Sequence, residues 1–273
     1  MASLILALSG FTARGDVFPA CDYSAIVVDD QGELWDLGTY PSGYVARHFG
    51  SGLPGTTDIA LGGYVGVTAT EFYQRSGSGV RAVFDLSADL QPGDQLNALV
   101  DDRKGGFYAT GTAGYLYQFT FSPYCWPDLC VTNLGPILAD PAARANSGGD
   151  LAWANKKQLL WANSNGDLWD VWNGTLVEHF IDSAGNPLRF DGLATYDYGG
   201  PLYGFFDNHS KHLDPHWWTP TFDYPFIIRG ATFSIPEPKT IVALATLAPG
   251  ALVWLWIRGR SRLRRGSQGT LRS

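Results

Sequence analysis

The densest group of potential metal ligands in the sequence lies between residues 207 and 216. His209, His212 and His216 are three of the five histidines of the chain, and two aspartates lie among them. Imidazole nitrogens and carboxylate oxygens bind zinc and other divalent ions. The spacing matches no established ligand pattern, however, and Pro215 predicts a loop. We favour a solvated loop and predict no cofactor, with the three histidines as the alternative metal ligands.

Paired aspartates offer a second possible ion site. Asp29 with Asp30 and Asp101 with Asp102 occupy equivalent positions in two copies of an internal repeat. Clustered carboxylate oxygens suit Ca²⁺. The preference of aspartate for turns explains the same residues more simply, and we favour that interpretation.

Cysteine chemistry centres on Cys125 and Cys130, which lie in the string Pro-Tyr-Cys-Trp-Pro-Asp-Leu-Cys. In an exported chain this spacing favours a short loop disulfide. A metal site would need two more soft ligands nearby, and the sequence offers none there. Cys21 is the third cysteine.

No motif of an established enzyme class is present. The sequence lacks a Gly-x-Ser-x-Gly elbow, a His-Glu-x-x-His pair, a phosphate-binding loop and a dinucleotide fingerprint. We therefore predict a non-enzymatic protein. The alternative is an extracellular carbohydrate-active enzyme, a glycoside hydrolase or lyase, or a sugar-binding propeller. A hydrolase would need two carboxyl groups about 5 to 10 Å apart at a cleft, and exposed aromatic rings could form a sugar platform.

Charge is segregated along the chain. Seven of the 19 basic residues but one of the 26 acidic residues follow Ile235, so residues 1–235 carry 12 basic and 25 acidic side chains. A nucleic-acid partner requires a basic footprint, and we exclude one for this body.

Internal repeats organise the residues between the two ends. Residues 99–117 align with residues 151–169 at a shift of 52, the same opening recurs at Ala25 and Leu193, and a weaker copy begins at Ile59. The five starts are 34, 40, 52 and 42 residues apart. Repeats of roughly 40 to 50 residues are typical of propeller blades.

Each copy has apolar and aromatic runs around glycine-containing turns, which predict a meander of three or four strands. One such meander cannot bury both of its faces, whereas about five around an axis can. We predict an all-β fold, a β-propeller-like body of about five meander repeats over residues 16–232. A β-sandwich is the alternative, because irregular spacing also fits two packed sheets.

The N-terminus suggests export. Residues 1–15 contain an apolar run followed by Ala13 and Gly15, small residues that a signal peptidase requires before Asp16. The usual basic region is missing, which a start codon placed too far downstream would explain. We predict a signal peptide, truncated at its beginning; a first buried strand is the alternative.

The C-terminus predicts a membrane span. Residues 240–257 carry no charge, and at about 1.5 Å per residue a helix of this length reaches roughly 27 Å, enough for a bilayer core. Five arginines follow and would keep that end in the cytoplasm: Arg258, Arg260, Arg262, Arg264 and Arg265. We predict a single transmembrane helix and a disordered tail over residues 266–273.

The order of Pro236, Glu237 and Pro238, the apolar span and the arginine cluster resembles a PEP-CTERM sorting domain over residues 233–265. The resemblance implies that a membrane enzyme, an exosortase, processes the protein near the Pro-Glu-Pro motif during export. It assigns recognition to that motif and membrane retention to the arginines. It also implies a Gram-negative setting that produces exopolysaccharide.

These features together predict an exported cell-surface or extracellular-matrix protein. A C-terminal helix would anchor it in the cell envelope before processing, after which it would be at the surface or outside the cell. The expected partners are the membrane, an exosortase-type enzyme and exopolysaccharide.

Overall fold

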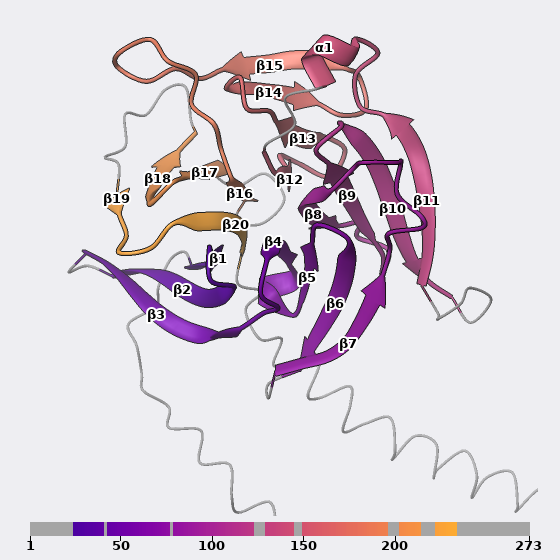
Figure 1. Cartoon of the computed structure of the whole chain (residues 1–273). Coiled ribbons are helices and arrows are strands. Elements are labelled where there is room, and N and C mark those ends of the chain that lie inside the picture. Colours follow the sequence, from indigo (N-terminus) through magenta and orange to yellow (C-terminus); the bar gives the residue numbers. More distant parts are fainter. Residues whose placement is uncertain are drawn as a thin grey trace, which may run out of the picture. The chain divides into compact units, whose positions relative to one another are not determined.

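The structure, a computed structural model, describes residues 24–40, 43–76, 79–122, 129–144, 149–195, 202–213 and 222–233. These residues form five four-stranded antiparallel sheets. Figure 1 shows the sheets arranged around a common axis, with one strand of each sheet at the centre. The prediction of an all-β propeller with five repeats is confirmed. The sandwich alternative is wrong, because the sheets radiate from an axis instead of facing each other in two layers.

Four blades are continuous in sequence and run from the axis outward. Blade 1 contains β4 (Thr56–Ala60), β5 (Val65–Thr68), β6 (Glu71–Ser76) and β7 (Gly79–Asp85). Blade 2 contains β8 (Leu96–Asp101), β9 (Phe107–Gly111), β10 (Tyr115–Phe121) and β11 (Leu129–Pro136). Blade 3 contains β12 (Leu151–Trp153), β13 (Leu159–Ala162), β14 (Asp167–Asp170) and β15 (Thr175–His179). Blade 4 contains β16 (Gly192–Thr195), β17 (Leu202–Phe206), β18 (His209–His212) and β19 (Phe222–Asp223). Two short helices, η1 (Leu61–Gly63) and α1 (Pro141–Arg144), lie in connections.

The fifth blade, called here the closing blade, joins both ends of the described chain. Its inner strand is β20 (Ile228–Phe233), which pairs antiparallel with β1 (Ser24–Asp29). The sheet continues outward through β2 (Glu33–Tyr40) and β3 (Gly43–Ser51). Because β20 also contacts β4 and β16, it completes the ring of inner strands.

The way in which the ring closes shows that one predicted repeat start was wrong. Ala25, predicted as the start of a repeat equivalent to the others, lies in the second strand of its blade. The other starts lie in innermost strands: Ile59, Leu99, Leu151 and Leu193. The repeat alignment matched a second strand, at Ala25, with the first strands of the other blades. It did so because every strand–turn–strand unit has the same alternation of apolar residues and the same turn chemistry.

A separate apolar cluster fills each of the five interfaces between blades. Between blades 1 and 2, the Phe72 ring centroid lies 5.3 Å from that of Phe107 and 5.7 Å from that of Phe119. The interface between the closing blade and blade 1 is smaller and centres on Val28, Leu34 and Ile59. Burying each such side chain contributes about 1.5 to 3 kcal/mol. Both faces of a blade are covered, which explains why most residues of the inner strands are buried.

One turn design recurs four times. An aspartate or asparagine Oδ1 accepts hydrogen bonds from the backbone N–H groups two and four residues later, at Asp29, Asp102, Asn163 and Asp182. The third residue after it is always a glycine with φ between 78° and 96°: Gly32, Gly105, Gly166 and Gly185. Glycine is favoured there because it alone adopts positive φ without a Cβ penalty. The pattern Asp/Asn-x-x-Gly thus marks the turns of this fold.

Several predicted segments lie outside the described residues: the signal peptide at 1–15, the sorting motif, the span at 240–257 and the tail. The chain divides into two units, Met1–Ser234 and Ile235–Ser273, and the second contains no described residue. In the part of the chain that is described, no helix is long and apolar enough to cross a membrane. The predictions for both ends stay predictions.

Candidate functional site

The histidines predicted as alternative metal ligands are placed only in part. His209 and His212 are the first and last residues of β18, so the prediction of a loop is wrong for this stretch, which pairs with β17. His216 lies outside the described residues. His209 Nδ1 lies 2.7 Å from Asp223 Oδ1. Within the described ranges, no group of three or more histidine, cysteine, aspartate or glutamate side chains could hold a metal ion.

The aspartate pairs belong to turns at opposite ends of their blades. Asp29 ends the second strand of the closing blade, whereas Asp102 follows the first strand of blade 2. Their remaining oxygens are also bonded: Asp29 Oδ2 accepts from Trp35 Nε1 at 2.8 Å, and Asp102 Oδ2 accepts from Gln118 Nε2 at 3.3 Å. Turn formation accounts for these carboxylates, which do not converge on one Ca²⁺ site.

Cys130 lies in β11 and forms a disulfide. Cys125 lies outside the described residues, so its pairing with Cys130 stays a prediction.

A histidine–carboxylate pair occurs at the same place in three consecutive blades. The nitrogen–oxygen distances are 2.7 Å in blade 3, 2.7 Å in blade 4 and 2.6 Å in the closing blade, for His179–Asp167, His209–Asp223 and His48–Glu33. In each pair, one member is the first residue of the third strand and the other lies in the fourth strand. Aligning the blades at their third strands would have revealed these pairs in the sequence.

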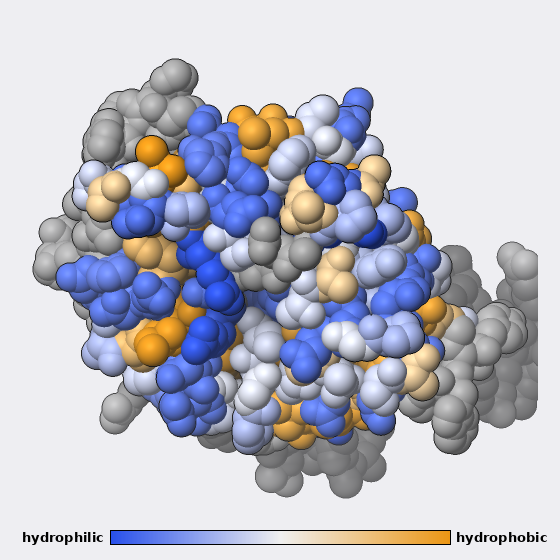
Figure 2. All heavy atoms as spheres, turned by 45° about the horizontal axis from the view of Figure 1, so that its top comes forward, coloured by the Kyte–Doolittle hydropathy of each residue, from blue (hydrophilic) through white to orange (hydrophobic). Residues whose placement is uncertain are grey.

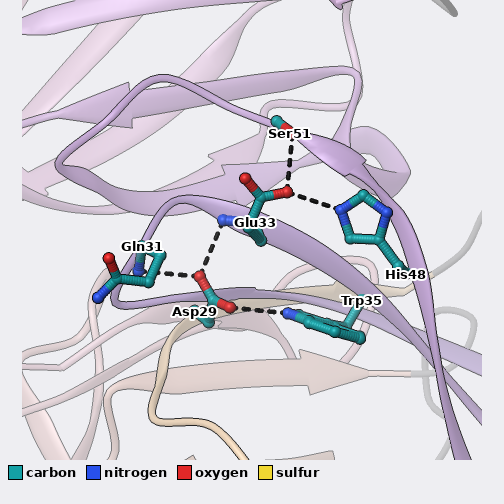
Figure 3. A network of polar contacts seen from close by, with 6 residues as sticks. All are labelled: Asp29, Gln31, Glu33, Trp35, His48 and Ser51. Carbon is teal, nitrogen blue, oxygen red and sulfur yellow. Dashed lines mark hydrogen bonds and ion pairs between the residues drawn. The ribbon is translucent and has the colours of Figure 1, made fainter.

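The pair in the closing blade belongs to the network in Figure 3, where His48 and Ser51 both point to Glu33. Ser51 Oγ donates to Glu33 Oε2 at 2.7 Å, the oxygen that His48 Nε2 also contacts. The hydrogen bonds from His48 and then Ser51 lower the pKa of Glu33. A serine nucleophile instead needs its hydroxyl aimed at a histidine base. These hydrogen bonds join the two outer strands of the blade, β2 and β3, and their geometry is not that of a catalytic serine.

Two carboxyl groups do lie together, but at the centre of the molecule. Asp58 and Asp150 are both 0% exposed, and their side chains are hydrogen-bonded to each other. A glycoside hydrolase presents its carboxyl pair to substrate in a cleft. This pair is closed off from solvent and does not fit that role.

The aromatic residues most suited to binding lie between blades 2 and 3. Trp172 is 44% exposed, and its ring centroid lies 5.4 Å from that of Tyr108 and 6.4 Å from that of Trp153. The Arg103 guanidinium carbon lies 4.0 Å from the Trp153 ring centroid. We call Tyr108, Trp153 and Trp172 the aromatic ledge; an exposed ring backed by two others can stack on a flat apolar ligand face.

The ledge is fixed by the turns beside it. Trp153 Nε1 donates to the Asp101 backbone oxygen at 2.8 Å, and an Arg103 terminal nitrogen donates to the Asn155 backbone oxygen at 3.0 Å. Burial raises the pKa of Asp101. The sequence allowed a sugar platform of exposed rings as one option, but it could not show which of the ten tryptophans are exposed and which are in the core.

The face of the molecule in Figure 2 is largely hydrophilic, and its apolar residues form separate patches. Scattered apolar residues are normal on a solvated surface, whereas one broad patch would mark an interface. A small, defined feature such as the aromatic ledge is therefore a better binding candidate than this face as a whole.

No protein-family model matches the chain, and no curated protein does. Among solved structures, it is similar to a protein of unknown function from Bacteroides caccae at 10% identity and a TM-score of 0.42, over 74% of this chain and 73% of that one. The structure of YCF48 bound to D1 peptide matches at 14% identity and a TM-score of 0.39, over 66% and 56%. BBS1N in complex with ARL6DN matches at 12% identity and a TM-score of 0.36, over 73% and 61%. At these identities and TM-scores, the comparisons carry no conclusion about the function of this chain.

Proposed function

We propose that the protein is a non-enzymatic five-bladed propeller that its C-terminal segment delivers to the cell envelope. The observation that carries the proposal is the order of elements after the last described strand. β20 ends at Phe233, and Pro236, Glu237 and Pro238, the uncharged residues 240–257 and the arginine cluster follow in sequence. Processing near the motif would therefore remove no strand of the propeller.

The physical basis is the preference of this segment for lipid. Eighteen residues without a charge can span the hydrocarbon core of a bilayer, and arginines at one end resist translocation. Such a segment would hold the propeller outside the membrane until an exosortase-type enzyme processes it, leaving the body at the surface or in the matrix.

Cell fractionation of the producing bacterium tests this proposal. The full chain is expected in the envelope, with a processed form at the surface, whereas a variant lacking residues 236–273 is expected to lose the membrane-bound form. A variant with Pro236, Glu237 and Pro238 changed to alanine should stay in the membrane at its full intact mass, because the span remains. Identical partition of the intact and shortened chains would overturn the proposal.

The aromatic ledge supports a second candidate function, binding of a neutral polysaccharide. The exposed ring of Trp172, next to Tyr108 and the polar turn at Arg103, offers the mix of apolar face and hydrogen-bonding groups that sugars use. Residues 1–235 carry 25 acidic against 12 basic side chains, so the body would repel polyanionic glycans.

Trp172→Ala in the full chain is expected to weaken binding to neutral glucans by about three- to tenfold, the value of one aromatic contact. Affinity electrophoresis in gels containing dextran or hydroxyethyl cellulose measures this change. Leu176→Ala is the matched control, because Leu176 is 50% exposed in the same blade but carries no ring. Equal binding by both variants and the unchanged protein would rule out the ledge as the site.

A further inference from the structure

One position recurs in all five blades where the inner strands meet at the axis. It is occupied by Asp58, Ala98, Asp150, Gly192 and Gly230, each directly before an apolar inner-strand residue. All five residues are buried. A Cβ on Gly230 would overlap Asp58 Oδ1, so the absence of a side chain there makes room for the carboxyl group. Two acidic residues thus share a space that three small residues leave open.

The two carboxyl groups bind backbone amides from every inner strand. Asp58 Oδ2 accepts from the N–H of Leu99 in β8, and Asp150 accepts from Leu151 in β12 and Leu193 in β16, both at 2.6 Å. The amides of Ile59 in β4 and Ala231 in β20 bond to Asp58 and Asp150, respectively. The inner strands belong to five different sheets, so no backbone ladder joins them, and these contacts link them instead.

One oxygen of the pair has no hydrogen-bond donor among the described residues, namely Asp58 Oδ1. The side chain of Asp58 nevertheless bonds to that of Asp150. Two ionised carboxylates in contact without solvent would repel each other and lose their hydration. A single proton on Asp58 Oδ1, donated to Asp150, turns that repulsion into a hydrogen bond.

We propose that this one proton, held between Asp58 and Asp150, stabilises the contacts that join the five inner strands at the axis. When the proton is lost in alkaline solution, these contacts weaken and the propeller becomes less stable. The proton belongs on Asp58 because Asp150 accepts three backbone amides and is the better-stabilised anion. Surrounding amide donors also favour a proton over a metal ion, since a cation prefers carbonyl and carboxylate oxygens.

Burial raises the pKa of Asp58 well above its ordinary value of 3.8, and the neighbouring Asp150 raises it further. Burial also raises the pKa of Asp150, whereas the hydrogen bond from Asp58 and those from the backbone amides of the inner strands lower it. The unfolded chain releases both protons near 3.8. The stabilising effect of the proton on Asp58 is therefore complete below that pH, and it is lost by the time the pH has risen through the raised pKa of Asp58.

Other ionisable groups near the inner strands could also make the stability depend on pH, and their contribution must be distinguished from that of Asp58 and Asp150. Tyr73 interacts with Asp58, but burial raises its pKa to about 12, so it stays neutral below that pH. Burial also raises the pKa of Asp101 and of Asp191. The charges that act on Asp101 come from Arg103 and Asp102, and those that act on Asp191 come from Arg189, Arg229 and Asp207. The main charges that act on these two aspartates are therefore not those of the axial pair.

Urea unfolding of the full chain between pH 5 and 8.5 tests the proposal. The folding equilibrium constant of the unchanged protein is expected to fall by up to about tenfold per pH unit as the pH rises across this range, the slope for one proton. Asp58→Asn is the reference, because its amide donates permanently to Asp150 while its oxygen still accepts from Leu99. This variant should fold and lose that part of the slope, leaving what the other ionisable groups contribute, Asp101 and Asp191 among them.

Asp150→Asn is the opposing variant of the same size. Its amide nitrogen would have to face backbone N–H groups, so we expect a much larger loss of stability than with Asp58→Asn. Equal pH slopes in the unchanged protein and Asp58→Asn would overturn the proposal, as would an Asp58→Asn chain that fails to fold. Better tolerance of Asp150→Asn would contradict the placement of the proton. Stabilisation by Ca²⁺ that a chelator reverses would show a bound cation in its place.

Discussion

Deletion of residues 228–273 is expected to abolish cooperative folding of the propeller, whereas deletion of residues 235–273 leaves it intact. The longer deletion removes β20, which pairs with β1 and contacts β4 and β16. The backbone groups of β1 that pair with β20 would lose their partners, and Asp150 would lose the hydrogen bond from Ala231. The net free energy of unfolding of a domain is only about 5 to 15 kcal/mol. We expect the stabilisation lost with a whole inner strand to be larger than this.

Thermal melting followed by circular dichroism compares the two truncated chains directly. The chain that ends at Ser234 should melt in one transition at the temperature of the full chain. The chain that ends at Ile227 should show no transition. Cooperative melting of both chains would mean that the propeller closes without β20. Loss of structure in both chains would mean that residues 235–273 are needed for the propeller to fold.

Replacement of Trp161 by alanine is expected to cost about 3 to 5 kcal/mol of unfolding free energy, the usual loss for a large aromatic core residue. Trp161 in β13 is 0% exposed and packs between blades 2 and 3 with Leu151 and Leu159. Its removal leaves a cavity that the flanking sheets cannot close, because each is also held by its other neighbour. Urea unfolding of the full chain measures the change.

Trp172→Ala serves as the control, since it removes the same side chain from a site that is 44% exposed. Its effect should be within about 1 kcal/mol, as at most surface positions. Comparable losses at Trp161 and Trp172 would show that the ledge is part of the core and would weaken its case as a binding site.

The fold class followed from the sequence because propeller blades are local structures. Alternating apolar residues and turn glycines such as Gly32 and Gly166 act over a few residues, so each copy predicts its own meander. Five copies then imply five blades, which the structure has. The turn interpretation of Asp29 and Asp102 rested on the same short-range chemistry, and their hydrogen bonds agree with it.

The closure of the propeller and the positions of the candidate functional residues could not be predicted from the sequence, because they depend on contacts between residues that are distant in the chain. The similarity at Ala25 could not show that its blade takes its inner strand from β20, because a strand pattern does not identify its partner. Nor could Asp58 and Asp150 be distinguished from turn aspartates until five strands met around them. Local sequence determines which segments become strands and turns, whereas the packing of the ring decides which side chains are buried together, which remain exposed and which must share a proton.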